Sequence, residues 1–146
     1  MSREEVLIKA LKEISYLDRF ILLREQYCSL KAPAPYADRN SVIEIIKSFG
    51  YEVKFISKGR FYKIESMGNV RSSLHFADMS GRAEFILNVE IDGVVCGGTF
   101  SGLSKKCGDS RRLNDPVFAS LDELNGIFEQ VFPIYEDLKK ELAKAG

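Results

Sequence analysis

Residues 82–100 decide the fold, and they spell Arg-Ala-Glu-Phe-Ile-Leu-Asn-Val-Glu-Ile-Asp-Gly-Val-Val-Cys-Gly-Gly-Thr-Phe. Two runs of alternating apolar residues meet at Asp92 and Gly93, a pair typical of a two-residue hairpin turn with positive φ. Such a turn fixes the register of its strands. The predicted opposite pairs are Ile91 with Val94, Val89 with Cys96, Leu87 with Gly98, and Phe85 with Phe100. These eight side chains share one face, which we predict to be the core face.

The other face of this hairpin is mixed, and we predict that it meets solvent. Its side chains are Arg82, Glu84, Ile86, Asn88, Glu90, Val95, Gly97 and Thr99. Antiparallel sheets commonly bury one face and leave the other wet. The hairpin therefore indicates a fold, while no comparable stretch of the chain carries a chemical signature.

A chain of 146 residues is long enough to bury a sizeable core, so residues 1–146 are predicted to form a single domain. Its 21 basic residues balance 21 acidic ones, which argues against a dedicated nucleic-acid binder, because that class usually has a basic excess. No apolar run approaches the ~20 residues that span a bilayer, and the charged N-terminal segment lacks a signal-peptide core. We therefore expect no membrane association.

The three cysteines are Cys28, Cys96 and Cys107, an odd number without any Cys-x-x-Cys spacing. Neither a disulfide framework nor a structural zinc site is predicted from them. Reduced thiols fit a cytoplasmic protein. Because His75 is the only histidine, we expect neither a metal nor another cofactor.

Helices are predicted before the strands. Ser2 and Glu5 have capping-box spacing, and apolar residues then recur at helical intervals. This first segment is either one long helix to about Ser29 or two helices with a break near Asp18, and Pro33 helps to end it. A further short helix follows, with Asp38, Asn40 and Ser41 as candidate N-caps. Its apolar stripe is Val42, Ile45, Ile46 and Phe49.

From Tyr51 the apolar period changes to two. Strands are predicted from Tyr51 to Phe55 and over residues 61–67 and 70–77, followed by the two strands of the hairpin. Five consecutive strands joined by short turns make an antiparallel meander.

Beyond Phe100 the alternation stops, and residues 101–116 are predicted to form a long loop with four basic side chains. Ser120 and Glu123 then have capping spacing for a final helix, in which we expect a kink at Pro133. The apolar stripe of that helix is Leu124, Phe128, Val131, Tyr135, Leu138 and Leu142. The predicted fold class is α+β: two N-terminal helices, a five-stranded antiparallel meander, and a long C-terminal helix packed on one sheet face.

No candidate for catalysis is favoured over a structural interpretation. A general base needs a positioned partner, and alternation gives His75 none, so an ordinary surface histidine is the better interpretation. Nearby Lys105, Lys106 and Arg111 would lower the pKa of Cys107, but no nucleophile signature surrounds it. Gly97 and Gly98 are explained by strand packing, with close approach of a ligand as the alternative. We predict no catalytic residue and do not expect an enzyme.

A small helix-flanked antiparallel sheet with one mixed face and no catalytic set resembles the immunity proteins of bacterial toxin systems, such as those of contact-dependent inhibition. The resemblance covers the plan of the whole chain. It implies stoichiometric capture of a cognate toxin domain, for which charge complementarity supplies speed and selectivity. The alternatives are a small-molecule or lipid-like ligand binder and a secretion-chaperone-like dimer. The sequence leaves open whether the chain is a monomer or a homodimer.

The partner is expected on the sheet face that the helices leave open, with the long loop reaching over its edge. The predicted contact residues are Lys63, Glu65, Arg71, Ser73, His75, Glu84, Asn88, Glu90, Lys105, Lys106, Arg111 and Arg112. This charged set suits a protein partner better than an apolar ligand. An acidic patch on the last helix, around Asp122, Glu129 and Glu136, is the alternative surface.

Overall fold

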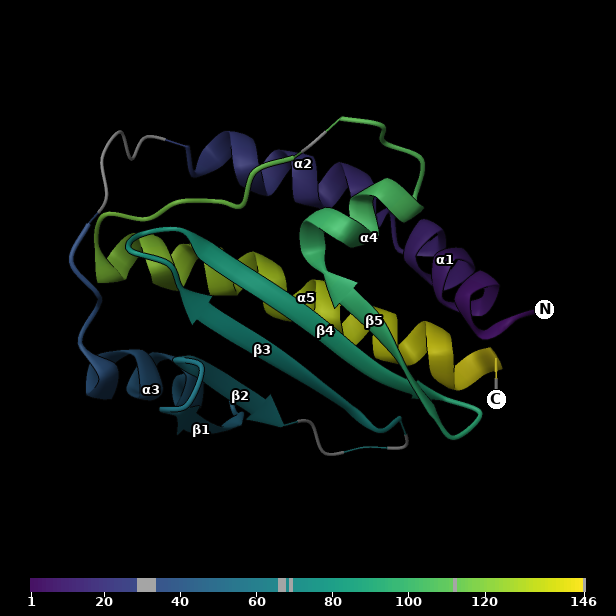
Figure 1. Cartoon of the computed structure of the whole chain (residues 1–146), viewed down its shortest axis with the longest axis horizontal. Coiled ribbons are helices and arrows are strands. Elements are labelled where there is room, and N and C mark those ends of the chain that lie inside the picture. Colours follow the sequence, from purple (N-terminus) through teal and green to yellow (C-terminus); the bar gives the residue numbers. More distant parts are fainter. Residues whose placement is uncertain (29–33, 66–67, 69, 112, 146) are drawn as a thin grey trace.

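The computed structural model describes residues 1–28, 34–65, 68, 70–111 and 113–145. Its elements are, in chain order, α1 (Arg3–Glu13), α2 (Tyr16–Gln26), α3 (Arg39–Ser48), β1 (Glu52–Ile56), β2 (Phe61–Glu65), β3 (Ser72–Asp78), β4 (Ala83–Ile91), β5 (Val94–Thr99), α4 (Phe100–Lys106) and α5 (Leu121–Ala145). The strands form one antiparallel sheet in the order β1-β2-β3-β4-β5 (Figure 1). The predicted α+β fold with a five-stranded meander is confirmed.

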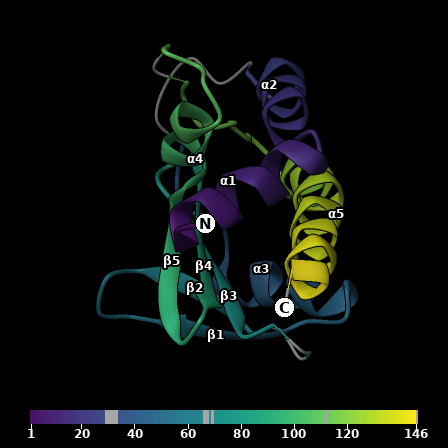
Figure 2. The same ribbon diagram turned by 90° about the vertical axis from the view of Figure 1, so that its right-hand side faces the viewer.

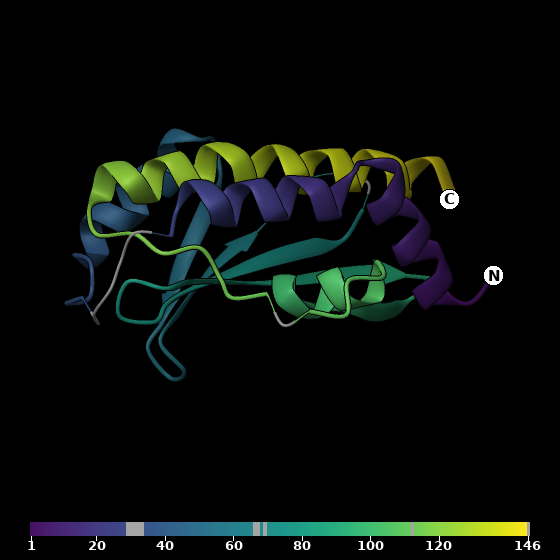
Figure 3. The same cartoon turned by 90° about the horizontal axis from the view of Figure 1, so that it is seen from above.

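The molecule has a sheet layer and a helix layer, with α5 and α2 side by side on one face of the sheet (Figures 2 and 3). We call that face the covered face. Its side chains are buried or partly buried, and along β4 they include Phe85, Leu87 and Val89. The opposite side is the open face, on which the even-numbered side chains of β4 are partly exposed.

The central hairpin has the predicted register. Asp92 and Gly93 both have positive φ, and the pairs 91–94, 89–96 and 87–98 form as expected. Two details differ. Phe100 begins α4 instead of ending β5, although its ring still lies 5.4 Å from that of Phe85. Val94 was predicted to be in the core but is 45% exposed, because it adjoins the turn at the end of the ladder.

The predicted stripe of α5 is the centre of the core, and all six of its side chains are buried. The Phe128 ring lies 5.1 Å from Phe76 and 5.9 Å from Phe85, so it joins the helix to β3 and β4. Pro133 lies inside the helix and is exposed. At the start of α5, the Glu123 amide donates to Ser120 Oγ at 3.1 Å, as the predicted cap requires.

The N-terminal helical segment is two helices, and the break lies at Ser15 instead of near Asp18. Ser15 has φ 57° and ψ 41°, a left-handed conformation that ends one helix and starts the next in a new direction. The predicted capping box at Ser2 and Glu5 is present, and Asp38 is the N-cap of α3. The helical segment was predicted to end near Ser29, which lies outside the described residues. The helix α2 ends at Gln26.

The predicted loop over residues 101–116 is wrong in its first third, where α4 forms. Thr99 is its N-cap, and its hydroxyl accepts the Gly102 amide at 3.0 Å. Phe100 and Leu103, spaced for one helical face, are both buried. In the described part of the chain no helix is long and apolar enough to cross a membrane.

Candidate interaction face

The ladder arranges the open face into two rows that cross the sheet. One row places Glu52, Glu65, Ser73, Asn88 and Gly97 side by side, from β1 to β5. The neighbouring row is Lys54, Lys63, His75, Ile86 and Thr99. The β1 side of this face therefore carries two acids beside two lysines, and the rows become neutral toward β5.

A hollow of about 300 Å³ lies on this face over β2, β3, β4 and β5, and we call it the central hollow. Its lining contains six of the predicted contact residues: Lys63, Glu65, Arg71, Ser73, Asn88 and Glu90. The remaining lining residues are Ser72, Val89 and Val95. The alternation of residues along the strands was thus sufficient to predict that these side chains lie on one surface.

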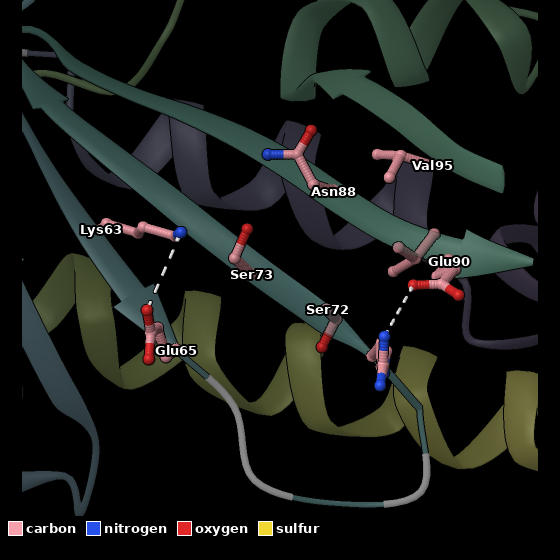
Figure 4. Close-up of a pocket in the computed structure, with 9 residues that line it drawn as sticks. Lys63, Glu65, Ser72, Ser73, Asn88, Glu90 and Val95 are labelled. Atoms are coloured by element: carbon pink, nitrogen blue, oxygen red, sulfur yellow. Dashed lines mark ion pairs between the residues drawn. The ribbon is translucent and has the colours of Figure 1, made fainter. Parts of the chain in front are cut away.

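Two ion pairs flank the central hollow, with Ser73 and Asn88 between them (Figure 4). Lys63 Nζ lies 3.8 Å from Glu65, and an Arg71 guanidinium nitrogen lies 3.9 Å from Glu90. These distances exceed those of a charge-assisted hydrogen bond, and the Arg71 side chain is 85% exposed. Such pairs stabilise a fold little, so their charged groups are available to a second molecule.

A second hollow of about 310 Å³ lies where the segment after α4 returns to the sheet, and we call it the loop hollow. Its lining is Arg82, Glu84, Thr99, Ser101, Gly102, Lys105, Leu113, Asn114 and Asp115. The return is fixed by the Ala83 amide, which donates to Pro116 O at 2.9 Å, and by a bridge between Arg82 and Val117. It brings the predicted residues Glu84 and Lys105 together.

Asp115 was not predicted, yet it is the most perturbed acid of the open face. Its side chain is 10% exposed and lies 3.6 Å from Arg82 Nε. Burial and the nearby Glu84 carboxylate raise the pKa of Asp115 to about 6, against the opposing effect of Arg82. No local pattern marks this residue, because its burial depends on the return of a distant segment to β4.

His75 lies on the open face, as predicted, but is half-buried. Its ring stacks on Phe61 at 4.6 Å. Burial and the neighbouring Lys63 lower the pKa of His75, so the imidazole is neutral at neutral pH. Its ladder neighbours, Lys63 and Ile86, supply no carboxylate that would orient it as a general base.

The basic residues of the predicted loop do not act together. Lys106 is drawn to the β5 edge, where its Nζ lies 2.9 Å from Glu4 and 3.5 Å from Gly97 O. Arg111 pairs with Asp109 at 2.7 Å. Neither residue lines either hollow. Lys106 therefore reaches an edge of the sheet without lining the hollows, and Arg111 pairs within its own loop. Arg112 lies outside the described residues.

The cysteines are free, and Cys107 is not activated. It is the C-cap of α4, and burial raises the pKa of its thiol, the reverse of the lowering that its basic neighbours led us to consider. Among the described residues, no three His, Cys, Asp or Glu side chains are placed to hold a metal ion.

Close approach at the glycine pair involves the protein's own backbone. A Cβ at Gly97 would lie 2.0 Å from Leu87 O, and this residue has φ +139°. Gly98, which was predicted to matter for packing against Leu87, has open space around it. Strand packing is thus the explanation, but the constrained residue is Gly97.

Comparison of the chain with protein-family models, with curated proteins and with solved structures found no match. The geometry of the open face is therefore the basis for inferring what the protein does.

Proposed function

We propose that this chain is a protein-binding domain whose open face receives the partner. The observation that carries the proposal is the central hollow, where two long ion pairs flank Ser73 and Asn88 on a face that none of the described helices covers. Hydrogen-bonding groups and weakly paired charges of both signs suit a polar, charged protein surface.

The loop hollow supports a basic group on the partner. The Glu84 carboxylate disfavours ionisation of Asp115, and Arg82 offsets this only in part. A lysine or arginine of the partner would relieve that repulsion. The central hollow offers Arg71 to an acidic group, so the two hollows together define an asymmetric charge pattern.

More specifically, we propose an immunity-type protein that neutralises a cognate bacterial toxin domain by stoichiometric binding in the cytoplasm. The support is the plan that the sequence predicted: a small α+β domain with a mixed polar sheet face. Binding is favoured over catalysis because His75 stacks on Phe61 with no carboxylate among its ladder neighbours, and burial raises the pKa of Cys107. A lipid-like ligand is not favoured, because edge-to-face and stacked aromatic rings pack between the sheet and α5.

The test begins with a pull-down from the native organism and with the toxin domain encoded immediately upstream, where one exists. Calorimetry then compares wild type with Arg71→Glu for the central hollow and Glu84→Lys for the loop hollow. Both substitutions should weaken binding by about tenfold or more in folded protein, since charge reversal opposes a complementary surface. Arg111→Glu is the matched control, because Arg111 lines neither hollow, and it should bind like wild type.

Full-strength binding by both variants would refute the open face as the binding site. The surface of α5 around Asp122 and Glu129 would then be the next to test, while Glu136 there already pairs with Lys139 and accepts from the Tyr51 hydroxyl. Absence of any toxin that the chain neutralises would refute the immunity assignment and leave the protein-binding proposal to the pull-down.

A further inference from the structure

The sheet has two edges, and the described helices cover one of them. At the β5 edge, Lys106 Nζ donates to Gly97 O while pairing with Glu4, and Arg3 Nε donates to Ile91 O at the turn between β4 and β5, at 3.1 Å. The side chains of α1 and α4 therefore occupy this edge, a common way to prevent pairing with another chain. At the β1 edge, no described helix lies beyond the strand, and α3 lies on the covered side of it (Figures 1 and 2).

The ladder shows which backbone groups of β1 point outward. Met79 and Arg82 exchange both amide–carbonyl bonds, at 2.8 and 3.4 Å, which makes them a hydrogen-bonded pair. Such pairs alternate along an antiparallel ladder and from one strand to the next. Followed across the sheet through the registers, this alternation directs Glu52, Lys54 and Ile56 toward β2. The N–H and C=O groups of Val53 and Phe55 consequently point out of the sheet.

These outward groups have no hydrogen-bond partner among the described residues. A hollow of about 480 Å³, lined by Tyr51, Glu52, Val53 and Lys54 among others, runs along the same edge. Both Glu52 and Lys54 are exposed and lie on the open face. The edge is thus a short strand with free backbone groups and alternating opposite charges.

We propose that β1 pairs with β1 of a second copy of this chain, antiparallel and about a two-fold axis at Val53, so that the two five-stranded sheets become one continuous sheet. In this register Glu52 lies opposite Lys54 of the second copy, and Lys54 opposite its Glu52. Both are non-hydrogen-bonded pairs, in which the two Cα atoms lie about 4.5 Å apart and side chains approach closely.

Charge selects this register over its neighbours. Moving the axis to Lys54 places two lysines opposite each other, and moving it to Phe55 places Lys54 opposite Ile56 of the second copy. Moving it to Glu52 opposes two glutamates. Like charges directly opposite destabilise a ladder, so only the register about Val53 satisfies both charged pairs. Because the strand has five residues, we expect a dimer of micromolar affinity.

The test is sedimentation velocity of four proteins: wild type, Glu52→Lys, Lys54→Glu, and the double exchange of both. Each single substitution places like charges opposite each other in both cross-strand pairs and should weaken the homodimer by about tenfold or more. The double exchange restores both pairs and should dimerise like wild type. An equimolar mixture of the two single variants should form a heterodimer, because lysines of one then face glutamates of the other.

Lys58→Glu is the matched control: it makes the same charge change in the exposed turn after β1 and should leave the dimer unchanged. All substituted side chains are exposed, so thermal melts should show folded protein. A wild type that stays monomeric at high micromolar concentration would refute the proposal. So would single variants that dimerise like wild type, or a mixture that fails to pair. The test is independent of any toxin, so it fails or succeeds separately from the proposed function.

Discussion

The two faces of the sheet are built from the same strands, yet one is packed under helices and the other is left open. On β3, Leu74 and Phe76 are fully buried under the helices, while Ser73 and His75, which alternate with them, are partly exposed on the open face. The covered face is held by apolar and aromatic packing. The open face has long ion pairs, a stacked histidine and an acid with a raised pKa. The difference indicates that stability is concentrated on the covered face, and it supports the proposal that the open face receives a partner.

The largest expected effect breaks the covered face. Phe128→Ala should lower the free energy of unfolding by about 3–5 kcal/mol, because the ring is fully buried against Phe76, Phe85 and Phe132 and its removal leaves a cavity. Val95→Ala on the open face is the control, since this side chain is 65% exposed and should change stability by less than about 0.5 kcal/mol. Urea unfolding measures both, and equal effects would remove the distinction between the faces.

How far the sequence predicts each face follows from the range of the interactions. The register from Val89 to Cys96 follows from one turn, and the α5 stripe follows from helical spacing, so the core was predictable. The same alternation gathered Lys63 and Asn88 in the central hollow. Alternation says nothing about residues whose surroundings depend on distant segments.

Two misses have that origin. The helix α4 was missed because its cap, Thr99, also continues the strand pattern, and only the burial of Leu103 distinguishes the two. Asp115 was missed because its burial requires the bond from Ala83 to Pro116 O. The ion pair of Lys106 could not be predicted either, because its partner, Glu4, is far away in sequence.

A second, smaller effect concerns the acid of the open face. The folded pKa of Asp115 is about 6, against 3.8 for the ordinary carboxyl, so between these values the folded state holds the proton more tightly than the unfolded state. The free energy of unfolding should therefore fall as the pH rises from about 4 to about 6, by at most about 3 kcal/mol from this group.

Asp115→Asn should remove the pH dependence of stability that Asp115 contributes, and it should give a protein more stable than wild type at pH 7. Urea unfolding at several pH values measures both curves. Glu84→Gln is the informative companion, because loss of the neighbouring charge should lower the pKa of Asp115 and flatten the curve only in part. If the Asp115→Asn protein were less stable at pH 7 and kept the wild-type slope from pH 4 to 6, the raised pKa would be contradicted.

The smallest expected effect sharpens the description of the open face through its only histidine. Two causes lower the pKa of His75, burial first and the Lys63 charge second. Lys63→Met removes the charge and keeps a hydrocarbon chain over the strand, so the pKa of His75 should rise without reaching its ordinary value, because burial and the stacked Phe61 ring remain. A proton NMR titration measures this directly, since the chain has one histidine.

Lys54→Met is the control, because Lys54 lies one strand farther along the same row and should move the His75 pKa less. Stability should change by less than about 0.5 kcal/mol in both variants, since the Lys63–Glu65 pair is long and exposed. An unchanged His75 pKa in Lys63→Met would contradict the effect of the Lys63 charge on His75, and a large loss of stability would mean that Lys63 supports the fold. A raised His75 pKa in a protein of unchanged stability would support the proposal that the covered face stabilises the fold and the open face is free to bind a partner.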